Sequence, residues 1–354
     1  KFLKNCKMKI GAIEVGLEKD PVIIAEMSGN HNQSLKRALK IVDVASASGA
    51  QILKLQTYTA DTITLDVERD EFMISNPNSL WAGRSMYSIY KEAHTPWEWQ
   101  KEIFQYSEEK GMTCFSAVFD ESSVDFLESI NICAYKIASP EIVHLPLIKT
   151  VALTGKPTII STGMASIAEI EFAVNEFRKF SSAEIALLKC TSSYPASPED
   201  SNVLCIPYLR DLFGCEVGIS DHTLGIGSAI AAVAHGATII EKHLTLSRKD
   251  GGVDSAFSME PAEMEKMVDE TKKARLALGK VAFGPTESEN ESMTFRRSIY
   301  VSENMKKGDL LTTKNTRIVR PNFGLSPSLY TNILGRRISK TIKKGTPLSW
   351  DLIN

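Results

Sequence analysis

The sequence lacks the features that mark several large classes of protein. Its 41 basic and 43 acidic residues leave a formal net charge of -2, so nothing attracts it generally to nucleic acid or anionic lipid. No apolar run approaches the length of a membrane span, and the first sixteen residues, "KFLKNCKMKIGAIEVG", lack the hydrophobic core of a signal peptide. We therefore expect a cytoplasmic protein that acts on small molecules, with no nucleic-acid or membrane partner.

Two motifs are also missing. The six cysteines show no CxxC spacing, and several lie in apolar runs where a reduced thiol packs as a small hydrophobic group. No GxGxxG follows the first expected strand, which argues against dinucleotide binding. The cysteines are Cys6, Cys114, Cys133, Cys190, Cys205 and Cys215. Their pattern indicates a reducing compartment.

Short apolar, β-branched runs alternate with longer stretches of helical period, such as residues 34–50, 97–111 and 262–279. This alternation is typical of βα units in a parallel sheet. The expected strands are residues 22–28, 51–56, 112–119, 134–139, 157–162, 184–190, 216–221 and 238–244. Eight such units in this length favour a (β/α)₈ TIM barrel over an open doubly wound sheet.

The pattern changes after the last expected barrel helix, at "GKVAFGPTESENES". We predict a barrel domain at residues 1–284, a polar linker at 285–294 and a small β-rich domain at 295–354. The last segment contains two KKG turns and is basic on balance. It is either an independent appendage or a lid that carries positive charge to an anionic ligand.

The expected carboxyl ends of the strands, where barrel enzymes place their chemistry, are unusually polar. Lysines end the second and fourth strands and serines end several others, a combination that suits a bound phosphate. The residues of this predicted anion cradle are Lys54, Ser116, Lys136, Ser139, Ser161 and Ser220. Either lysine alone would more often be a solvated residue, but the set together favours binding.

Two histidines, His222 and His243, end the neighbouring seventh and eighth strands. Adjacent strands lie about 5 Å apart, so both imidazoles can reach one divalent ion. Such a site would leave room for water and substrate oxygens and would act as a Lewis acid. Other histidines have weaker claims: His31 could line the mouth of the barrel, and His235 fits a structural role in a helix.

A series of motifs, in order along nearly the whole chain, resembles the sialic acid synthase family. They include "IIAEMSGNHNQS", "AYKIASPEI", "PTIISTGMAS", "LLKCTSSYP", "VGISDHTLG" and "IIEKHLTL", and the chain ends in a segment similar to that family's SAF (antifreeze-like) domain. The segments "NPNSLWAGRSMYSIYKEAHTPWEWQ" and "KDGGVDSAFSMEP" most resemble the pseudaminic acid branch. The resemblance implies a transferase that condenses phosphoenolpyruvate with an N-acetylated amino sugar, here 2,4-diacetamido-2,4,6-trideoxy-L-altrose, and releases phosphate.

The resemblance also implies roles for single residues. Phosphoenolpyruvate contacts would fall on Lys54, Lys136, Ser139, Ser161 and Ser220, and the metal, Mn²⁺ or else Co²⁺ or Mg²⁺, on His222 and His243. Sugar contacts would fall on Glu26, Gln56, Glu141, Tyr194 and Asp254, with Glu26 and Glu141 also catalytic. Arg320 would reach the other subunit's active site, which implies a domain-swapped homodimer.

One segment departs from the family pattern. The third strand reads "FSAVF", with Ala117 where relatives have a hydroxyl residue, so a phosphate contact is either missing or supplied by Ser116.

Three other functions stay open beside the pseudaminic acid branch. They are an N-acetylneuraminic or legionaminic acid synthase, an aldolase that forms a Schiff base on Lys54 or Lys136, and a sugar-binding module without turnover.

Overall fold

The computed structural model describes residues 8–354, so Cys6 lies outside the described residues. The chain forms two compact units, residues 1–279 and residues 280–354. In the part of the chain that the structure describes, no helix is both long and apolar enough to cross a membrane.

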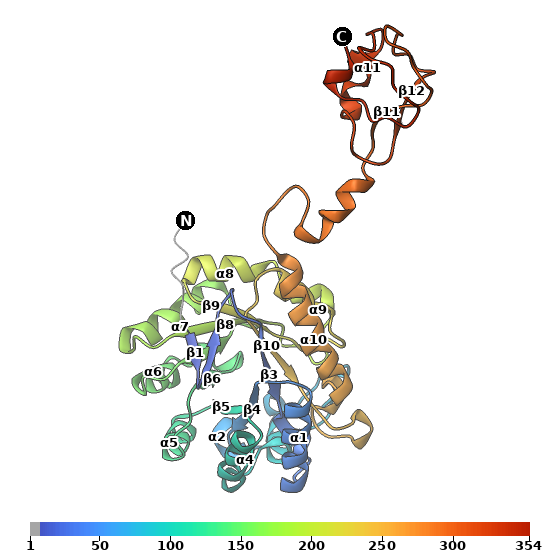
Figure 1. Cartoon of the computed structure of the whole chain (residues 1–354). Helices are drawn as coiled ribbons and strands as arrows, with labels where there is room; N and C mark the ends of the chain where they lie inside the picture. The colour runs from blue at the N-terminus through green and yellow to red at the C-terminus, as the bar shows by residue number, and fades with distance from the viewer. Residues whose placement is uncertain (1–7) are drawn as a thin grey trace. The chain divides into compact units, whose positions relative to one another are not determined.

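The first unit is a closed barrel of eight parallel strands in the order β10-β3-β4-β5-β6-β7-β8-β9 (Figure 1). All eight expected strands are present, which confirms the predicted TIM barrel. The strands are β3 (Val22–Glu26), β4 (Ile52–Thr57), β5 (Thr113–Val118), β6 (Tyr135–Ile137), β7 (Thr158–Ser161), β8 (Ile185–Cys190), β9 (Glu216–Ser220) and β10 (Ile239–His243).

One main helix follows each barrel strand, and together they surround the barrel (Figure 1). Helix boundaries follow local capping chemistry: the Ser34 side chain accepts from the Arg37 backbone N–H, and Gly49, at φ +84°, lies just beyond the same helix. These helices are α1 (Leu35–Ala47), α4 (Trp97–Glu109), α5 (Glu121–Ser129), α6 (Leu145–Leu153), α7 (Ile167–Phe180), α8 (Cys205–Phe213), α9 (Gly227–Ala234) and α10 (Pro261–Leu278).

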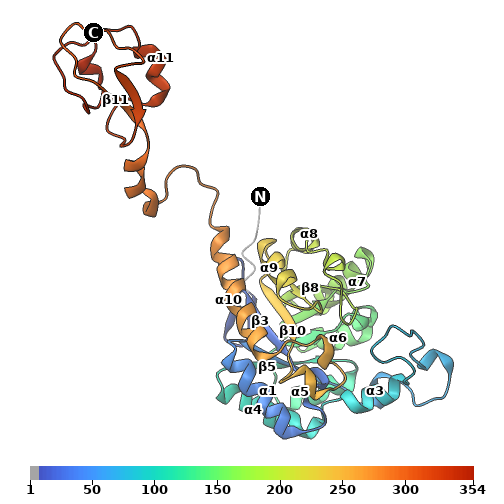
Figure 2. The same ribbon diagram turned by 90° about the vertical axis from the view of Figure 1, so that its right-hand side faces the viewer.

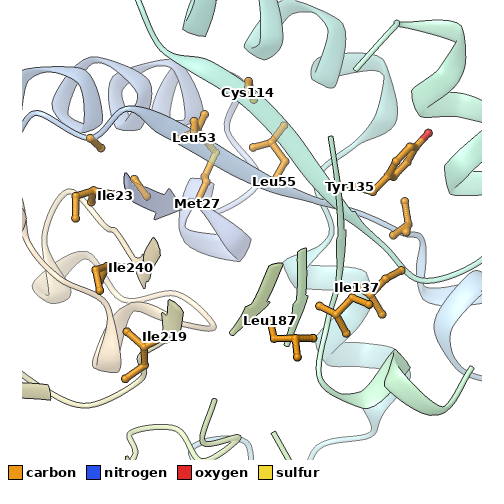
Figure 3. Packing of buried hydrophobic residues seen from close by; sticks show 14 of the residues in the cluster. Ile23, Met27, Leu53, Leu55, Cys114, Tyr135, Ile137, Leu187, Ile219 and Ile240 are labelled. Atoms are coloured by element: carbon orange, nitrogen blue, oxygen red, sulfur yellow. The ribbon is translucent and has the colours of Figure 1, made fainter. Parts of the chain in front are cut away.

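Alternation along the strands separates two apolar layers. Outward-facing residues such as Ile23, Leu53 and Ile240 pack against the helices in the larger cluster, part of which appears in Figure 3. Inward-facing residues such as Ile24 and Ile239 form a second cluster. Because the period is two, each strand's alternation also decides which of its last residues face the barrel interior.

A short hairpin not expected from the sequence joins this inner cluster. Strands β1 (Met8–Ile10) and β2 (Ile13–Val15) pair antiparallel through a turn in which Gly11 takes φ +58°. Met8, Ile10 and Val15 pack with the inward-facing residues that begin the barrel strands. The hairpin therefore seals the amino-terminal end of the barrel and leaves the opposite end for chemistry.

A long insertion separates β4 from α4. It contains α2 (Ala60–Ile63) and α3 (Met86–Ala93) and extends to the side of the barrel (Figure 2). It is tied back by a small apolar cluster in which Ile89 and Trp81 pack with Val253 of the loop after β10. The insertion thus reaches the carboxyl-terminal face of the barrel.

The second unit has its own core and few long elements, as its sequence predicts. Strands β11 (Ser298–Val301) and β12 (Thr316–Val319) pair antiparallel, and one short helix, α11 (Tyr330–Ile333), packs beside them. The cluster is aliphatic, with Ile299, Ile333 and Ile338 fully buried. This small β-rich unit therefore folds around side chains from its own residues.

Candidate active site

The carboxyl-terminal end of the barrel interior holds a cluster of buried ionic groups. Lys54 Nζ lies 2.5 Å from Glu26 Oε2 and 3.6 Å from Glu241 Oε1. Lys136 Nζ lies 2.8 Å from both oxygens of Glu241. All four side chains are almost fully buried. The two predicted lysines therefore meet, and Glu241 bridges them.

Burial and ion pairing oppose each other in this cluster, and burial prevails at Lys136, whose pKa it lowers in spite of Glu241. Despite the opposing effect of burial, Lys136 and Lys54 lower the pKa of Glu241 to about 2. The pKa of Lys54 is raised because the carboxylates of Glu241 and Glu26 outweigh its burial. Burial raises the pKa of Glu26 in spite of Lys54. An anion that binds both ammonium groups must compete with Glu26 and Glu241. The sequence analysis did not predict this competition.

Of the four predicted cradle serines, Ser220 contacts this cluster directly, and Ser139 and Ser161 lie at the ends of β6 and β7. Ser220 Oγ donates to Glu241 Oε1 at 3.2 Å, and Ser139 Oγ accepts from the Gly163 N–H at 3.0 Å. The hydroxyl of Ser161 is buried without a hydrogen-bond partner in the described part of the chain. A buried hydroxyl without a partner is costly, so it is available to a ligand.

Ser116 does not join this group. Its hydroxyl lies 2.6 Å from Thr57 Oγ1, which in turn donates to Gln100 of α4, on the helix side of the barrel. Alternation puts Ala117, not Ser116, on the inner face, opposite Lys136 in the register. The expected hydroxyl contact from β5 is therefore absent, and we exclude Ser116 from the site.

The two histidines lie together, with ring centroids 5.3 Å apart. His222 Nδ1 is 2.9 Å from the carbonyl of Thr191, to which it donates, so Nε2 carries the lone pair when the ring is neutral. His243 Nδ1 is buried and has no hydrogen-bond partner among residues 8–354. Burial holds the pKa of His243 well below its usual range, which leaves a neutral imidazole suited to a metal ion.

These donors fit a divalent cation that completes its coordination with other ligands. Within residues 8–354, no three histidine, cysteine, aspartate or glutamate side chains are grouped so as to hold a metal ion. His222 and His243 would therefore be the two protein ligands. Contact with Cys190 raises the pKa of His222 against the effect of burial, so a metal would have to displace the proton that this contact favours.

Aromatic rings enclose the histidines. The Tyr194 ring lies 4.5 Å from that of His222, and Phe257 lies 4.9 Å from His243 and 5.1 Å from Tyr194. Trp81 of the insertion lies 5.7 Å from Tyr194 and donates its indole N–H to the Val253 carbonyl. The wall of the site next to the histidines is therefore apolar.

A string of polar groups links the ionic cluster to the loop after β10. Gln56 Nε2 donates to Glu26 Oε1 at 2.9 Å and to Ser28 Oγ at 3.0 Å. The Ser28 hydroxyl donates to the carboxylate of Asp254. The predicted residues Glu26, Gln56 and Asp254 thus belong to one network, in which Ser28 is a member that the sequence did not single out.

Glu141 lies in a 3₁₀ turn, Pro140–Val143, after β6. Its Oε2 atom is buried and has no hydrogen-bond partner among the residues that the structure describes. Burial raises the pKa of this carboxyl to about 7, so it exchanges protons near neutral pH. Glu141 is therefore suited to proton transfer.

Replacing Glu141 by glutamine is expected to stabilise the protein at about pH 8 and not at about pH 4. Folding raises this pKa from 4.5 to about 7, so the free energy of unfolding falls as the pH rises between these values, because the unfolded chain releases its proton first. The shift corresponds to roughly 3 kcal/mol, reduced to roughly 2 by partial exposure. Denaturant unfolding at both pH values measures it, with Glu171→Gln on the exposed face of α7 as the control. An equal effect of the Glu141 variant at both pH values would contradict the raised pKa.

The structure also shows the surroundings of two further predicted residues. Arg320 follows β12 in the second unit, where its side chain is exposed. His31 does not line the mouth: it is fully buried, with Nε2 3.2 Å from the Thr95 hydroxyl and its ring edge-on to Trp99. His31 therefore has a structural role.

A TIM barrel whose sealed end is opposite a buried lysine, glutamate and histidine cluster has the architecture of a barrel enzyme. Residues 41–282 match the NeuB family and residues 296–354 match the SAF domain. The chain belongs to the NeuB family.

Individual relatives give a finer comparison. The chain is 40% identical to the pseudaminic acid synthase of Campylobacter jejuni over 96% of its own length and 98% of the relative's. It is 36% identical to the N,N'-diacetyllegionaminic acid synthase of Legionella pneumophila, over 94% of each chain. The crystal structure of the N-acetylneuraminic acid synthetase of Leptospira borgpetersenii superposes with a TM-score of 0.71 at 33% identity, covering 82% of this chain and 95% of that one.

Proposed function

We propose that this protein is a pseudaminic acid synthase. It would join phosphoenolpyruvate to 2,4-diacetamido-2,4,6-trideoxy-L-altrose and release phosphate by C–O cleavage. The observation that carries the proposal is that two lysines meet on Glu241 of β10, the strand that ends in His243 beside His222, in a NeuB-family barrel. The higher identity to the pseudaminic acid synthase than to the legionaminic acid synthase favours this sugar.

Phosphoenolpyruvate would occupy the lysine side of the cluster. Lys54 and Lys136 supply charge-assisted contacts, and the hydroxyls of Ser139, Ser161 and Ser220 lie on the neighbouring strand ends. The bound anion would pair with these two ammonium groups and replace some of the contacts that Glu26 and Glu241 make with them. A divalent cation on His222 and His243, Mn²⁺ by preference, would supply Lewis-acid polarisation of the sugar aldehyde.

The carboxyl groups would assist the proton transfers of the reaction. Attack by C3 of phosphoenolpyruvate on the aldehyde carbon forms a C–C bond, turns the aldehyde oxygen into a hydroxyl by protonation, and leaves positive charge at C2. Water then adds to C2 and loses a proton, phosphate departs with its bridging oxygen, and the C2 hydroxyl loses its proton as the ketone forms. Glu141, with its pKa of about 7, is suited to give or accept these protons, and Glu26 to stabilise the charge.

The sugar would lie between the polar string and the aromatic wall. Gln56, Asp254 and Tyr194 offer hydrogen bonds to its amides and hydroxyls. Phe257 and Trp81 offer apolar surface to the deoxy methyl and the two acetamido methyls, since both rings pack on Tyr194. A substrate with three methyl groups suits this wall better than N-acetylmannosamine.

We also propose a homodimer in which Arg320 of the basic second unit completes the partner's site. Glu26→Ala and Arg320→Ala should each abolish turnover, and co-expression of the two variants should restore about a quarter of wild-type activity. The reason is that half of the dimers are mixed, and each mixed dimer has one site with neither substitution. Phosphate release by the purified mixture measures this. No recovery above the single variants would show that Arg320 does not act across subunits.

A Schiff-base aldolase is the main chemical alternative. It needs a neutral amine. Against the effect of burial, the carboxylates of Glu241 and Glu26 raise the pKa of Lys54, which disfavours a neutral amine there, whereas burial lowers the pKa of Lys136 in spite of Glu241. The proposed condensation forms no covalent enzyme adduct, so borohydride added with pyruvate should give none by mass spectrometry, and an adduct on either lysine would favour the aldolase. Turnover itself separates the enzyme from a module that only binds sugar.

A further inference from the structure

Each candidate metal ligand directly follows one member of a buried ion pair. Asp221 precedes His222, and Lys242 precedes His243. Lys242 Nζ lies 2.9 Å from Asp221 Oδ2, and the two side chains are among the most buried charged groups of the protein. The pair therefore links the two strand ends on which the histidines stand.

The Lys242 ammonium uses all three of its N–H bonds on the segment that carries His222. Besides the Asp221 carboxylate, it donates to the carbonyls of Thr223 at 2.6 Å and Gly225 at 3.0 Å. The other oxygen of Asp221 accepts from the Thr223 N–H at 2.9 Å and from its hydroxyl at 2.7 Å. Residues on both sides of His222 are thus held by one side chain of β10.

Lys242 has no direct access to a substrate. Its neighbours Glu241 and His243 belong to the inner site, so the period of two directs Lys242 to the helix side of the barrel. The preceding outward residue of β10, Ile240, is apolar and packs in the outer core. A fully buried lysine at the next outward position is costly unless it is well paired, and its partners all belong to the loop of one histidine.

We propose that Lys242 and Asp221 are positioning residues that fix the separation and orientation of the two imidazoles. The inference rests on the proposed metal site at His222 and His243. The ion pair holds the backbone next to each histidine on the helix side of the barrel, and the Thr191 carbonyl fixes the tautomer of His222. Removing a group that orients a metal ligand in this way lowers metal affinity about 10–100-fold, and we expect a loss of about this size here.

Titration with Mn²⁺ alone, followed by the paramagnetic resonance signal of the free ion, tests the proposal. Lys242→Met keeps an unbranched side chain one atom shorter and removes its charge and its three N–H donors. It is expected to weaken Mn²⁺ binding about 10–100-fold, whereas His222→Ala should abolish it. Arg210→Met is the matched control, because Arg210 pairs with Glu216 at the opposite end of β9 and is similarly buried. That variant should lose stability and keep wild-type Mn²⁺ affinity.

The outcomes separate the pair from the site. Wild-type affinity in Lys242→Met, with binding lost in His222→Ala, would overturn the positioning role. Wild-type affinity in His222→Ala would instead refute the proposed metal site itself. If Lys242→Met does not fold, Thr223→Val removes the hydroxyl bond to Asp221, together with a longer one to Ser228, and leaves the ion pair in place. This milder variant should weaken Mn²⁺ binding severalfold, and unchanged affinity in it would count against the proposal.

Discussion

Replacing His222 or His243 by alanine is expected to lower kcat about a thousandfold or more while the barrel stays folded. Each variant removes one of the two proposed ligands for an ion that would stabilise the charge developing in the transition state. A loss of about 4 kcal/mol of that stabilisation corresponds to three powers of ten in rate. The fold should persist because neither ring is part of the large apolar clusters. Phosphate release measures turnover, and circular dichroism measures the fold.

His235→Ala is the matched control for these variants. His235 caps the end of α9, is only partly buried and lies outside the site, so its loss should leave kcat unchanged. Near wild-type turnover by His222→Ala after treatment with a chelator would show that the histidines do not hold a catalytic ion.

The second large effect is expected for Lys54→Met, which should weaken phosphoenolpyruvate binding about a hundredfold. A charge-assisted contact is lost, at about 1.5–3 kcal/mol, and Glu26 and Glu241 then repel the anion without their shared counter-charge. Removing one partner of a buried ion pair also lowers the free energy of unfolding, by roughly 3–5 kcal/mol. Calorimetry with phosphoenolpyruvate, well below the melting temperature, measures the affinity.

Lys189→Met provides the comparison. Lys189 lies on β8, directed away from the barrel interior, and donates to the carbonyl of Cys190. Its replacement should leave phosphoenolpyruvate affinity within about twofold, so a similar loss in both variants would indicate a nonspecific charge effect. Unchanged affinity in Lys54→Met would place the anion elsewhere.

The barrel was predictable because its evidence is local. Each strand is a run of apolar residues and each helix has its own period and caps, so the order of the elements follows from the chain alone. The β1–β2 hairpin was missed because its two three-residue strands resemble a loop, and only their packing under the barrel distinguishes them. Its role depends on distant residues.

The site was predictable to the level of strand ends but not of faces. In "FSAVF", burial of Phe115 in the inner cluster directs Ser116 outward, and a strict period of two would have predicted this. The same rule places Glu241 beside His243 on the inner face and Lys242 behind it. The Ser28–Asp254 bond joins residues 226 positions apart, and no local pattern signals it.

We expect this site to condense phosphoenolpyruvate with a diacetamido sugar and to cleave a C–O bond. The most direct measurement uses phosphoenolpyruvate labelled with ¹⁸O at the bridging oxygen, together with Mn²⁺ and 2,4-diacetamido-2,4,6-trideoxy-L-altrose. The released phosphate should carry the label, a nonulosonic acid of the expected mass should form, and this sugar should turn over faster than N-acetylmannosamine. Unlabelled phosphate, or faster turnover of N-acetylmannosamine, would contradict this expectation.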